Sequence, residues 1–168
     1  MKKISIIIGL FLVVILLCGC EKKTSIIINN EPINTSKMEH KHCTRNGSMT
    51  SGKVVLEYDI YYTGDVLNVV QSMERVISDD QDILTSYESA YKGIHAHYEG
   101  LEYYDTEVIR NSNSVTSTIN INYDKLDIDK LISIEGEEDN IFINKKASVS
   151  KWLELAKKFG TKCELAED

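Results

Sequence analysis

The sequence predicts an α+β fold, in which an antiparallel sheet of about four strands is built from two hairpins and helices pack on one face. Two observations lead to this prediction. Apolar and polar side chains alternate at 54–63 and 115–124, a pattern typical of half-buried strands. Apolar side chains recur every three or four positions at 83–98 and 152–159, a spacing typical of helices with one buried face.

The first hairpin is expected between Val54 and Ile77. Its first strand places valine, leucine, isoleucine and two tyrosines on one face. Thr63-Gly64-Asp65 has the composition of a tight turn, and the residues after it are rich in β-branched side chains, which favour a return strand.

Helices are expected between and after the hairpins. A helix capped by Ser78 separates the first hairpin from a second hairpin at 101–124. A short helix at 127–132 and a final helix capped by Ser148 or Ser150 follow.

The N-terminus has the pattern of an export signal. Two lysines precede an apolar run that starts at Ile4 and ends in the sequence Leu-Cys-Gly-Cys at 17–20. The run is shorter than the roughly 20 residues of a comfortable transmembrane helix. Residues 17–20 resemble a bacterial lipobox, which implies a signal peptide at 1–19, acylation of Cys20 by membrane lipid, and a cell-membrane location facing outside the cytoplasm. An uncleaved membrane anchor, the alternative, leaves the domain on the same side.

The rest of the chain is expected to divide into a tether and one domain. Residues 20–42 comprise the lipidated cysteine and a polar, flexible tether, interrupted only by three isoleucines at 26–28. Residues 43–168 are long enough to form one folded domain.

The charge of the chain excludes some partners. The net charge is −7, and it becomes −9 once the two signal lysines are removed. An acidic domain is repelled by the phosphates of nucleic acid and by anionic lipid headgroups. We therefore expect no nucleic-acid partner, and membrane contact only through the lipid on Cys20.

Two cysteines remain in the expected domain, near its two ends. Cys43 and Cys163 would lie in a compartment where disulfides persist, and their polar flanks favour a bridge over the alternative of two free buried thiols. Such a bridge closes a loop of roughly 120 residues, for which the chain-entropy model gives at most about 4–5 kcal/mol.

The histidines and acidic residues do not predict a metal site. His40 and His42 precede Cys43, but this cluster could bind zinc or copper only if the cysteine were a free thiolate. His95 and His97 lie two positions apart on the expected helix and point away from each other. The acids from Asp124 onward follow no calcium-loop pattern and form a solvated face. We expect no metal and no other cofactor.

Catalytic motifs are also missing from the sequence. It contains no nucleophile elbow, phosphate loop or His-Glu-x-x-His motif, so we expect that the protein is not an enzyme. The nine tyrosines are its most distinctive feature, because tyrosine combines a broad apolar area with a polar tip. Most fall on the apolar faces and are expected in the core. Tyr61 and Tyr104 fall on the opposite faces and are the candidates for a binding surface.

Five segments of the chain together resemble the YehR-like bacterial lipoproteins. The resemblance covers about residues 43–163 and implies a small α+β lipoprotein domain with a terminal Cys43–Cys163 bridge, but no established activity. The segments are Cys43-Thr44-x-x-Gly47, Tyr58-x-Ile60-x-Tyr62-x-Gly64-Asp65, Tyr91-Lys92-Gly93, Val115-Thr116-x-Thr118-x-x-Ile121-x-Tyr123 and Phe159-Gly160-Thr161-Lys162-Cys163.

These observations define a functional expectation. The protein is expected to be a membrane-anchored extracytoplasmic lipoprotein, a non-catalytic accessory module that binds a small ligand or peptide. The alternative is an envelope protein that contacts another protein or a cell-wall component.

Overall fold

The computed structural model describes residues 25–134, 136–137 and 141–166. The expected signal peptide at 1–19 and the expected lipid attachment site Cys20 lie outside the described residues. Within the described ranges, none of the helices combines the length and apolar character needed to cross a bilayer.

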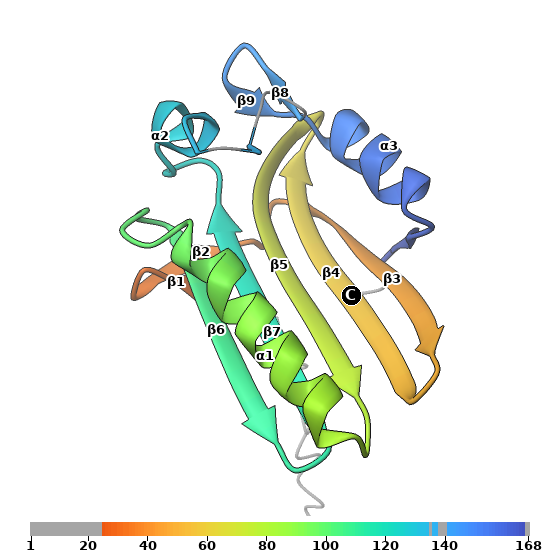
Figure 1. Ribbon diagram of the computed structural model, residues 1–168. Helices are drawn as coiled ribbons and strands as arrows, with labels where there is room; N and C mark the ends of the chain where they lie inside the picture. The colour runs from red at the N-terminus through yellow and green to blue at the C-terminus, as the bar shows by residue number, and fades with distance from the viewer. Residues whose placement is uncertain (1–24, 135, 138–140, 167–168) are drawn as a thin grey trace, which may run out of the picture.

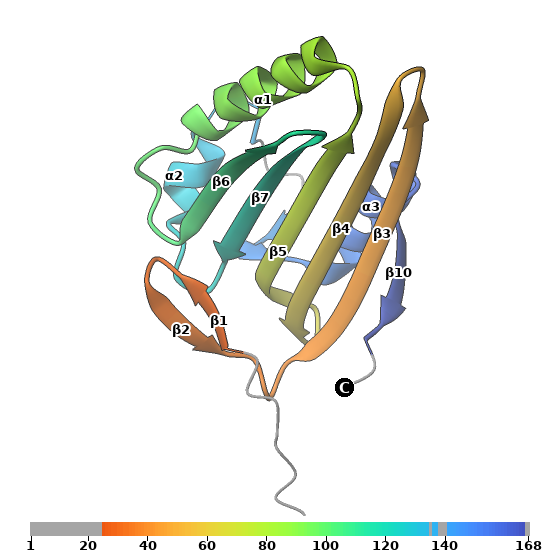
Figure 2. The same cartoon turned by 90° about the horizontal axis from the view of Figure 1, so that it is seen from below.

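The centre of the fold is a six-stranded antiparallel sheet, with strands in the order β10-β3-β4-β5-β7-β6 (Figures 1 and 2). Its strands are β3 (Glu39–Met49), β4 (Gly52–Thr63), β5 (Val66–Ile77), β6 (Tyr104–Asn111), β7 (Ser114–Asn122) and β10 (Lys162–Leu165). Two small two-stranded sheets accompany it, formed by β1 (Ser25–Ile28) with β2 (Glu31–Asn34) and by β8 (Phe142–Ile143) with β9 (Lys146–Ala147).

The predicted four-stranded α+β architecture is wrong, because the structure is mostly β. Strands contain about half of the described residues, and helices contain fewer than a quarter. The large sheet gains β3 and β10, which sequence patterning did not identify. Strand β3 buries only Cys43, and β10 buries none of its residues, so neither shows the apolar alternation of a half-buried strand.

The two predicted hairpins and the helices associated with them do form. Hairpins β4–β5 and β6–β7 are separated by α1 (Gln81–Ala96) and followed by α2 (Ile128–Ile132) and α3 (Val149–Lys158). The N-cap of α1 is Asp80 and not Ser78: the Asp80 side chain accepts hydrogen bonds from the backbone of Asp82 and Ile83. The hydroxyl of Ser78 instead donates to the carbonyl of Ser51.

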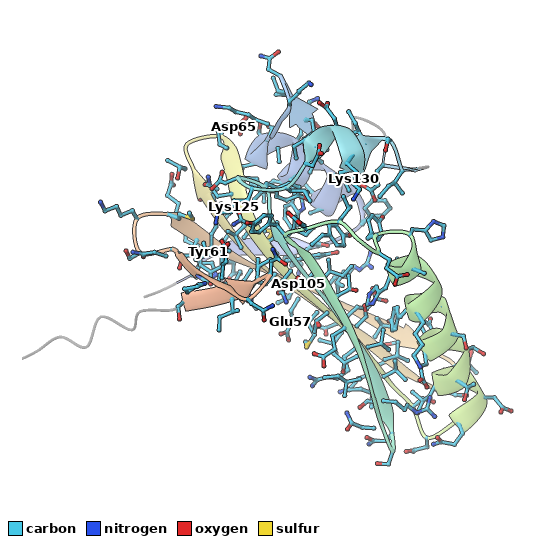
Figure 3. The ribbon with its side chains drawn as sticks, turned by 90° about the vertical axis from the view of Figure 1, so that its left-hand side faces the viewer. Glu57, Tyr61, Asp65, Asp105, Lys125 and Lys130 are labelled. Atoms are coloured by element: carbon cyan, nitrogen blue, oxygen red, sulfur yellow. A yellow bond between two sulfur atoms is a disulfide. The ribbon has the colours of Figure 1, made fainter. Side chains whose placement is uncertain are left out.

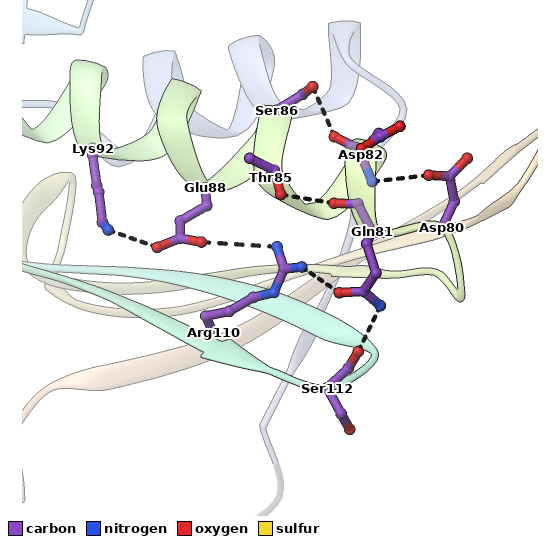
Figure 4. Close-up of polar contacts among 9 residues, drawn as sticks. All are labelled: Asp80, Gln81, Asp82, Thr85, Ser86, Glu88, Lys92, Arg110 and Ser112. Carbon is purple, nitrogen blue, oxygen red and sulfur yellow. Dashed lines mark hydrogen bonds and ion pairs between the residues drawn. The ribbon is translucent and has the colours of Figure 1, made fainter.

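Helix α1 is fixed to the β6–β7 hairpin by a polar network at its N-terminal half (Figure 4). Arg110 of β6 donates to the side chain of Gln81 at 2.6 Å and pairs with Glu88 at 3.8 Å. Gln81 in turn donates to the carbonyl of Ser112 at 2.9 Å. Under the helix, the Leu84 side chain is fully buried in a cluster with residues of β5 and β7. These contacts hold α1 over the β6 edge of the sheet.

The N-terminal segment is not simply a tether, because the described residues already form a strand at Ser25–Ile28, before the expected domain boundary at Cys43. Residues Asn29 and Asn30 form the two-residue turn between β1 and β2, with φ of 54° and 60°. Ile26 and Ile28 of β1 are buried in a cluster with Tyr61 and Val69 of the large sheet. Seen from the β6 edge, this hairpin and α1 lie on opposite sides of the sheet (Figure 3).

The predicted disulfide between Cys43 and Cys163 is confirmed. The two residues face each other in the register of β3 and β10, with their Cα atoms 4.0 Å apart. Cys43 is fully buried, and the bond joins residues 120 positions apart in the chain. The disulfide therefore attaches the short C-terminal strand to the edge of the sheet.

Candidate functional site

The candidate site is a groove of about 250 Å³ on the helix side of the sheet. Helix α1 packs on β5, β6 and β7, and α3 lies towards β4, so the middle of the sheet between them forms the floor (Figure 1). The lining residues come from five segments: Leu56 and Tyr58; Val70, Ser72 and Glu74; Tyr91, Ile94 and His95; Ser117, Ile119, Ile121 and Tyr123; and Trp152.

The floor of the groove follows from strand alternation and register. Alternate residues of β4, β5 and β7 point to the helix side of the sheet. Ser72 lies opposite Tyr58 on one side and Ile119 on the other. In the next row, Glu74 lies opposite Leu56 and Ser117. The register thus places a carboxylate among apolar and hydroxyl side chains.

One wall of the groove is aromatic. The rings of Tyr58 and Trp152 meet edge to face, with centroids 5.2 Å apart. Trp152 lies in the first turn of α3, where its backbone donates to the carbonyl of Ser148, the N-cap residue. Burial raises the pKa of the Tyr58 hydroxyl, and smaller opposing effects come from Arg45, which lowers it, and Glu74, which raises it. The Glu74 carboxylate is therefore close enough to the Tyr58 hydroxyl to affect its ionisation.

The other wall, formed by α1, is polar at its base. The hydroxyl of Tyr91 donates to the Glu74 carboxylate at 3.0 Å. Burial, with the added charge of Glu74, raises the pKa of Tyr91. Nε2 of His95 lies 2.9 Å from the hydroxyl oxygen of Ser117. Burial lowers the pKa of His95, so the imidazole is neutral at neutral pH.

The pairing of Ser117 with His95 resembles part of a hydrolase triad, but it lacks the features that activate a serine. The Ser117 side chain belongs to a residue that is only 6% exposed. Within the described part of the chain, no carboxylate bonds the remaining nitrogen of His95, which a triad needs to orient the base. Ser117 and His95 both line the groove.

The two tyrosines predicted as a binding surface do not form one. Tyr61 is 7% exposed, because the β1–β2 hairpin covers it and its ring stacks on His40 at 4.3 Å. Tyr104 is half-buried and stacks on Tyr98 with ring centroids 4.4 Å apart, and burial raises its pKa. They lie on opposite sides of the sheet, since Tyr61 packs against the hairpin and Tyr104 packs into the helix-side core. The prediction for Tyr61 is therefore wrong, and the structure does not bring the pair together.

The histidines that precede Cys43 have a different partner from the one considered in the sequence. Nε2 of His40 and Nδ1 of His42 each lie 2.9 Å from the same oxygen of Asp59 on β4. Cys43 points to the other side of the sheet and is bonded to Cys163. The alternative His-Cys cluster thus does not form.

The groove residues were not identified as a site from the sequence, although one signal was present. On β5, Val70, Ser72, Glu74 and Val76 occupy alternate positions on the helix side. An acidic residue at a position where the pattern predicts an apolar one is the signal that could have identified the groove.

Comparison with known proteins supports the fold. No family model and no curated protein matches the chain. Among solved structures, it is similar to the NMR structure of E. coli YehR, with 16% sequence identity, 79% of this chain and 94% of that chain covered, and a TM-score of 0.54. The NMR structure of a protein from Streptococcus pneumoniae TIGR4 matches with 14% identity, 80% and 89% coverage, and a TM-score of 0.46. The chain therefore has a YehR-like fold, and the likeness extends to the fold alone.

Proposed function

We propose that this protein is a lipid-anchored, extracytoplasmic binding module that holds a small ligand in the groove between α1 and α3 without transforming it. The observation that carries this proposal is the groove itself, where aromatic side chains and a single carboxylate line a hollow on the middle of the sheet. Ligand sites typically combine apolar and aromatic walls with a few placed polar groups.

The size of the groove supports a small ligand. Its volume of about 250 Å³ lies just below the roughly 300–1,000 Å³ of pockets for drug-sized molecules. A molecule of a few heavy atoms, or one side chain of a peptide, fits this space. The rings of Tyr58 and Trp152 supply contact area with little loss of conformational entropy on binding.

The proposed location rests on the N-terminal sequence. The export pattern and Cys20 at the end of the apolar run favour acylation outside the cytoplasm. The Cys43–Cys163 disulfide supports the same location, because disulfides persist in oxidising compartments and are rare in the cytosol.

Native mass spectrometry of the protein purified from its own host tests the binding function. The wild-type protein is expected to retain a ligand as added mass. Ser72→Phe fills the groove from the floor and should abolish this retention. Gln71→Phe is the matched control, because Gln71 is the neighbouring residue of β5 and points to the other side of the sheet.

Two outcomes contradict the proposal. One is a wild-type protein that carries no added mass; the other is undiminished retention in Ser72→Phe. Circular dichroism of both variants establishes that the fold is intact before the masses are compared.

A second candidate function, contact with an envelope protein, is favoured by the β10 edge. Among the described residues, strand β10 pairs with residues 41–44 of β3 and is the outermost strand of the large sheet. Phe159 and Leu165 near it are 63% and 67% exposed. Unpaired strand edges and exposed apolar side chains are typical of protein contact sites. Crosslinking in intact cells from a photoreactive residue at position 159 should capture the same partner repeatedly; the absence of any recurring partner would contradict this function.

A further inference from the structure

We propose that the ligand of the groove is a small organic cation with an N–H donor, an alkylammonium or guanidinium group, which binds Glu74 beside the rings of Tyr58 and Trp152. This inference rests on the proposed function, because it assigns a ligand class to the same groove.

The first support is an unpaired carboxylate. Glu74 is half-buried on the floor of the groove, and its one hydrogen bond from another side chain in the described chain comes from Tyr91. No ion pair involves Glu74 among the described residues. Removing an ionised carboxylate from water is unfavourable unless a cation or several donors compensate. A carboxylate has about four lone-pair sites, so acceptor capacity is left for a ligand.

The second support is that the nearby basic side chains do not donate hydrogen bonds to the Glu74 carboxylate. Arg45 lies in the same cross-strand row as Leu56 and Glu74, but its guanidinium donates to the carbonyl of Phe159 at 3.1 Å. His95 is neutral at neutral pH because burial lowers its pKa. Neither side chain pairs with Glu74, so its carboxylate is available to a cationic ligand.

The third support is the aromatic wall. Tyrosine and tryptophan rings attract cations within about 6 Å of the ring centre, with a gain of roughly 0.5–2 kcal/mol. A carboxylate beside such rings selects for cations. An anion is repelled by Glu74. A neutral donor can form a hydrogen bond with the carboxylate, but it leaves the negative charge without an opposite charge beside it.

The single tryptophan of the chain provides a direct measurement, because Trp152 lines the groove. Its emission is recorded at neutral pH and constant ionic strength during titration with n-butylammonium, 1-butanol or butyrate. n-Butylammonium and 1-butanol share a butyl chain, and butyrate has a propyl chain with the carboxylate as its fourth carbon, so the probes are similar in size and differ in charge. We expect saturable binding of n-butylammonium with a Kd roughly tenfold or more below that of 1-butanol, because only the ammonium adds an attraction between opposite charges to its hydrogen bond with Glu74. We expect no saturable binding of butyrate.

Three variants test the role of Glu74. Glu74→Gln should remove the preference for n-butylammonium over 1-butanol, and Glu74→Asp should retain it in part. Glu57→Gln removes the same charge from the neighbouring strand, and should leave the preference unchanged because Glu57 points away from the groove. Thermal melts of each variant establish that it is folded.

The outcomes distinguish this inference from the proposed function. Equal Kd values for n-butylammonium and 1-butanol would overturn the cation assignment and leave ligand binding in the groove intact. A preference that persists in Glu74→Gln would overturn the role of Glu74. If no probe changes Trp152 emission saturably, the alkylammonium assignment fails, while the retained-mass experiment still decides whether the groove binds a ligand.

Discussion

Asp65, in the turn between β4 and β5, connects two parts of the chain that are more than 80 residues apart. One oxygen of its carboxylate accepts a hydrogen bond from the hydroxyl of Ser148 at 2.7 Å, and the other accepts from the backbone of Ser150 at 2.8 Å. Ser148 is the N-cap of α3, the helix that carries Trp152. These hydrogen bonds lower the pKa of Asp65 below its usual value.

The lowered pKa predicts how the effect of Asp65→Asn depends on pH. An acid with a lowered folded-state pKa stabilises the fold above its unfolded-state pKa, and this contribution disappears as the pH falls through the folded-state value. Asp65→Asn should therefore lower the melting temperature at neutral pH, and the difference from wild type should shrink below the ordinary aspartate pKa of about 4.

Thermal melts at neutral and acidic pH measure this difference. Asp79→Asn is the control, because Asp79 is exposed and makes no hydrogen bond or ion pair within the described chain. A deficit of Asp65→Asn that stayed constant with pH would show that the carboxylate charge is not what stabilises the start of α3.

At the scale of single residues, the disulfide could be predicted from the sequence, because its formation depends on which cysteines the chain contains. The pairing of Cys43 with Cys163 was predictable from the number of cysteines in the expected domain and from their polar flanks. The burial of Tyr61 was not predictable, because it depends on the β1–β2 hairpin, a distant segment whose polar composition predicts a tether. The position of Glu74 in a groove was also not predictable, because it depends on which part of the sheet α1 and α3 leave uncovered.

The β1–β2 hairpin offers a matched test of packing at the scale of an element. Ile28 is fully buried against the sheet, whereas its neighbour Ile27 is 64% exposed. Ile28→Ala should lower the free energy of unfolding by about 2–5 kcal/mol, the usual range for a buried isoleucine. Ile27→Ala should change it by less than about 0.5 kcal/mol, as for most surface substitutions.

Urea denaturation measures both values. If the two variants lost the same small amount of stability, the hairpin would not be packed on the sheet, and the expectation of a tether in this segment would be restored.

The elements that the sequence did not predict share a physical cause. Strands β4 and β7 show clear alternation because their alternate, apolar residues pack into the helix-side core. Strand β3 has polar side chains on both faces and joins the sheet through backbone pairing with β4. Backbone hydrogen bonds carry no sequence signature, so a polar strand near the edge resembles a linker. The hairpin did leave a signal in Asn29-Asn30, since asparagine tolerates positive φ.

At the scale of the whole molecule, the disulfide closes nearly the full length of the folded chain. Replacing both Cys43 and Cys163 by serine should lower the free energy of unfolding by at most about 4–5 kcal/mol, because the unfolded chain regains the freedom of an open loop. Urea denaturation with and without reductant measures this loss. The double variant should be insensitive to reductant; an identical midpoint for oxidised and reduced wild type would show that the bridge adds no stability.

The hairpin at the start of the fold has a consequence for how the proposed anchor holds the protein. A flexible tether over residues 20–42 would allow a distance of up to roughly 75 Å between the domain and its lipid, at about 3.3–3.6 Å per extended residue. The first strand of the described residues begins at Ser25, five residues after Cys20, and five residues span at most roughly 18 Å. If Cys20 is acylated, this short connection would hold the domain close to the bilayer and restrict its orientation. Its hairpin side would be held next to the lipid, and the groove on the opposite side of the sheet would face the outer medium, from which its ligand would arrive.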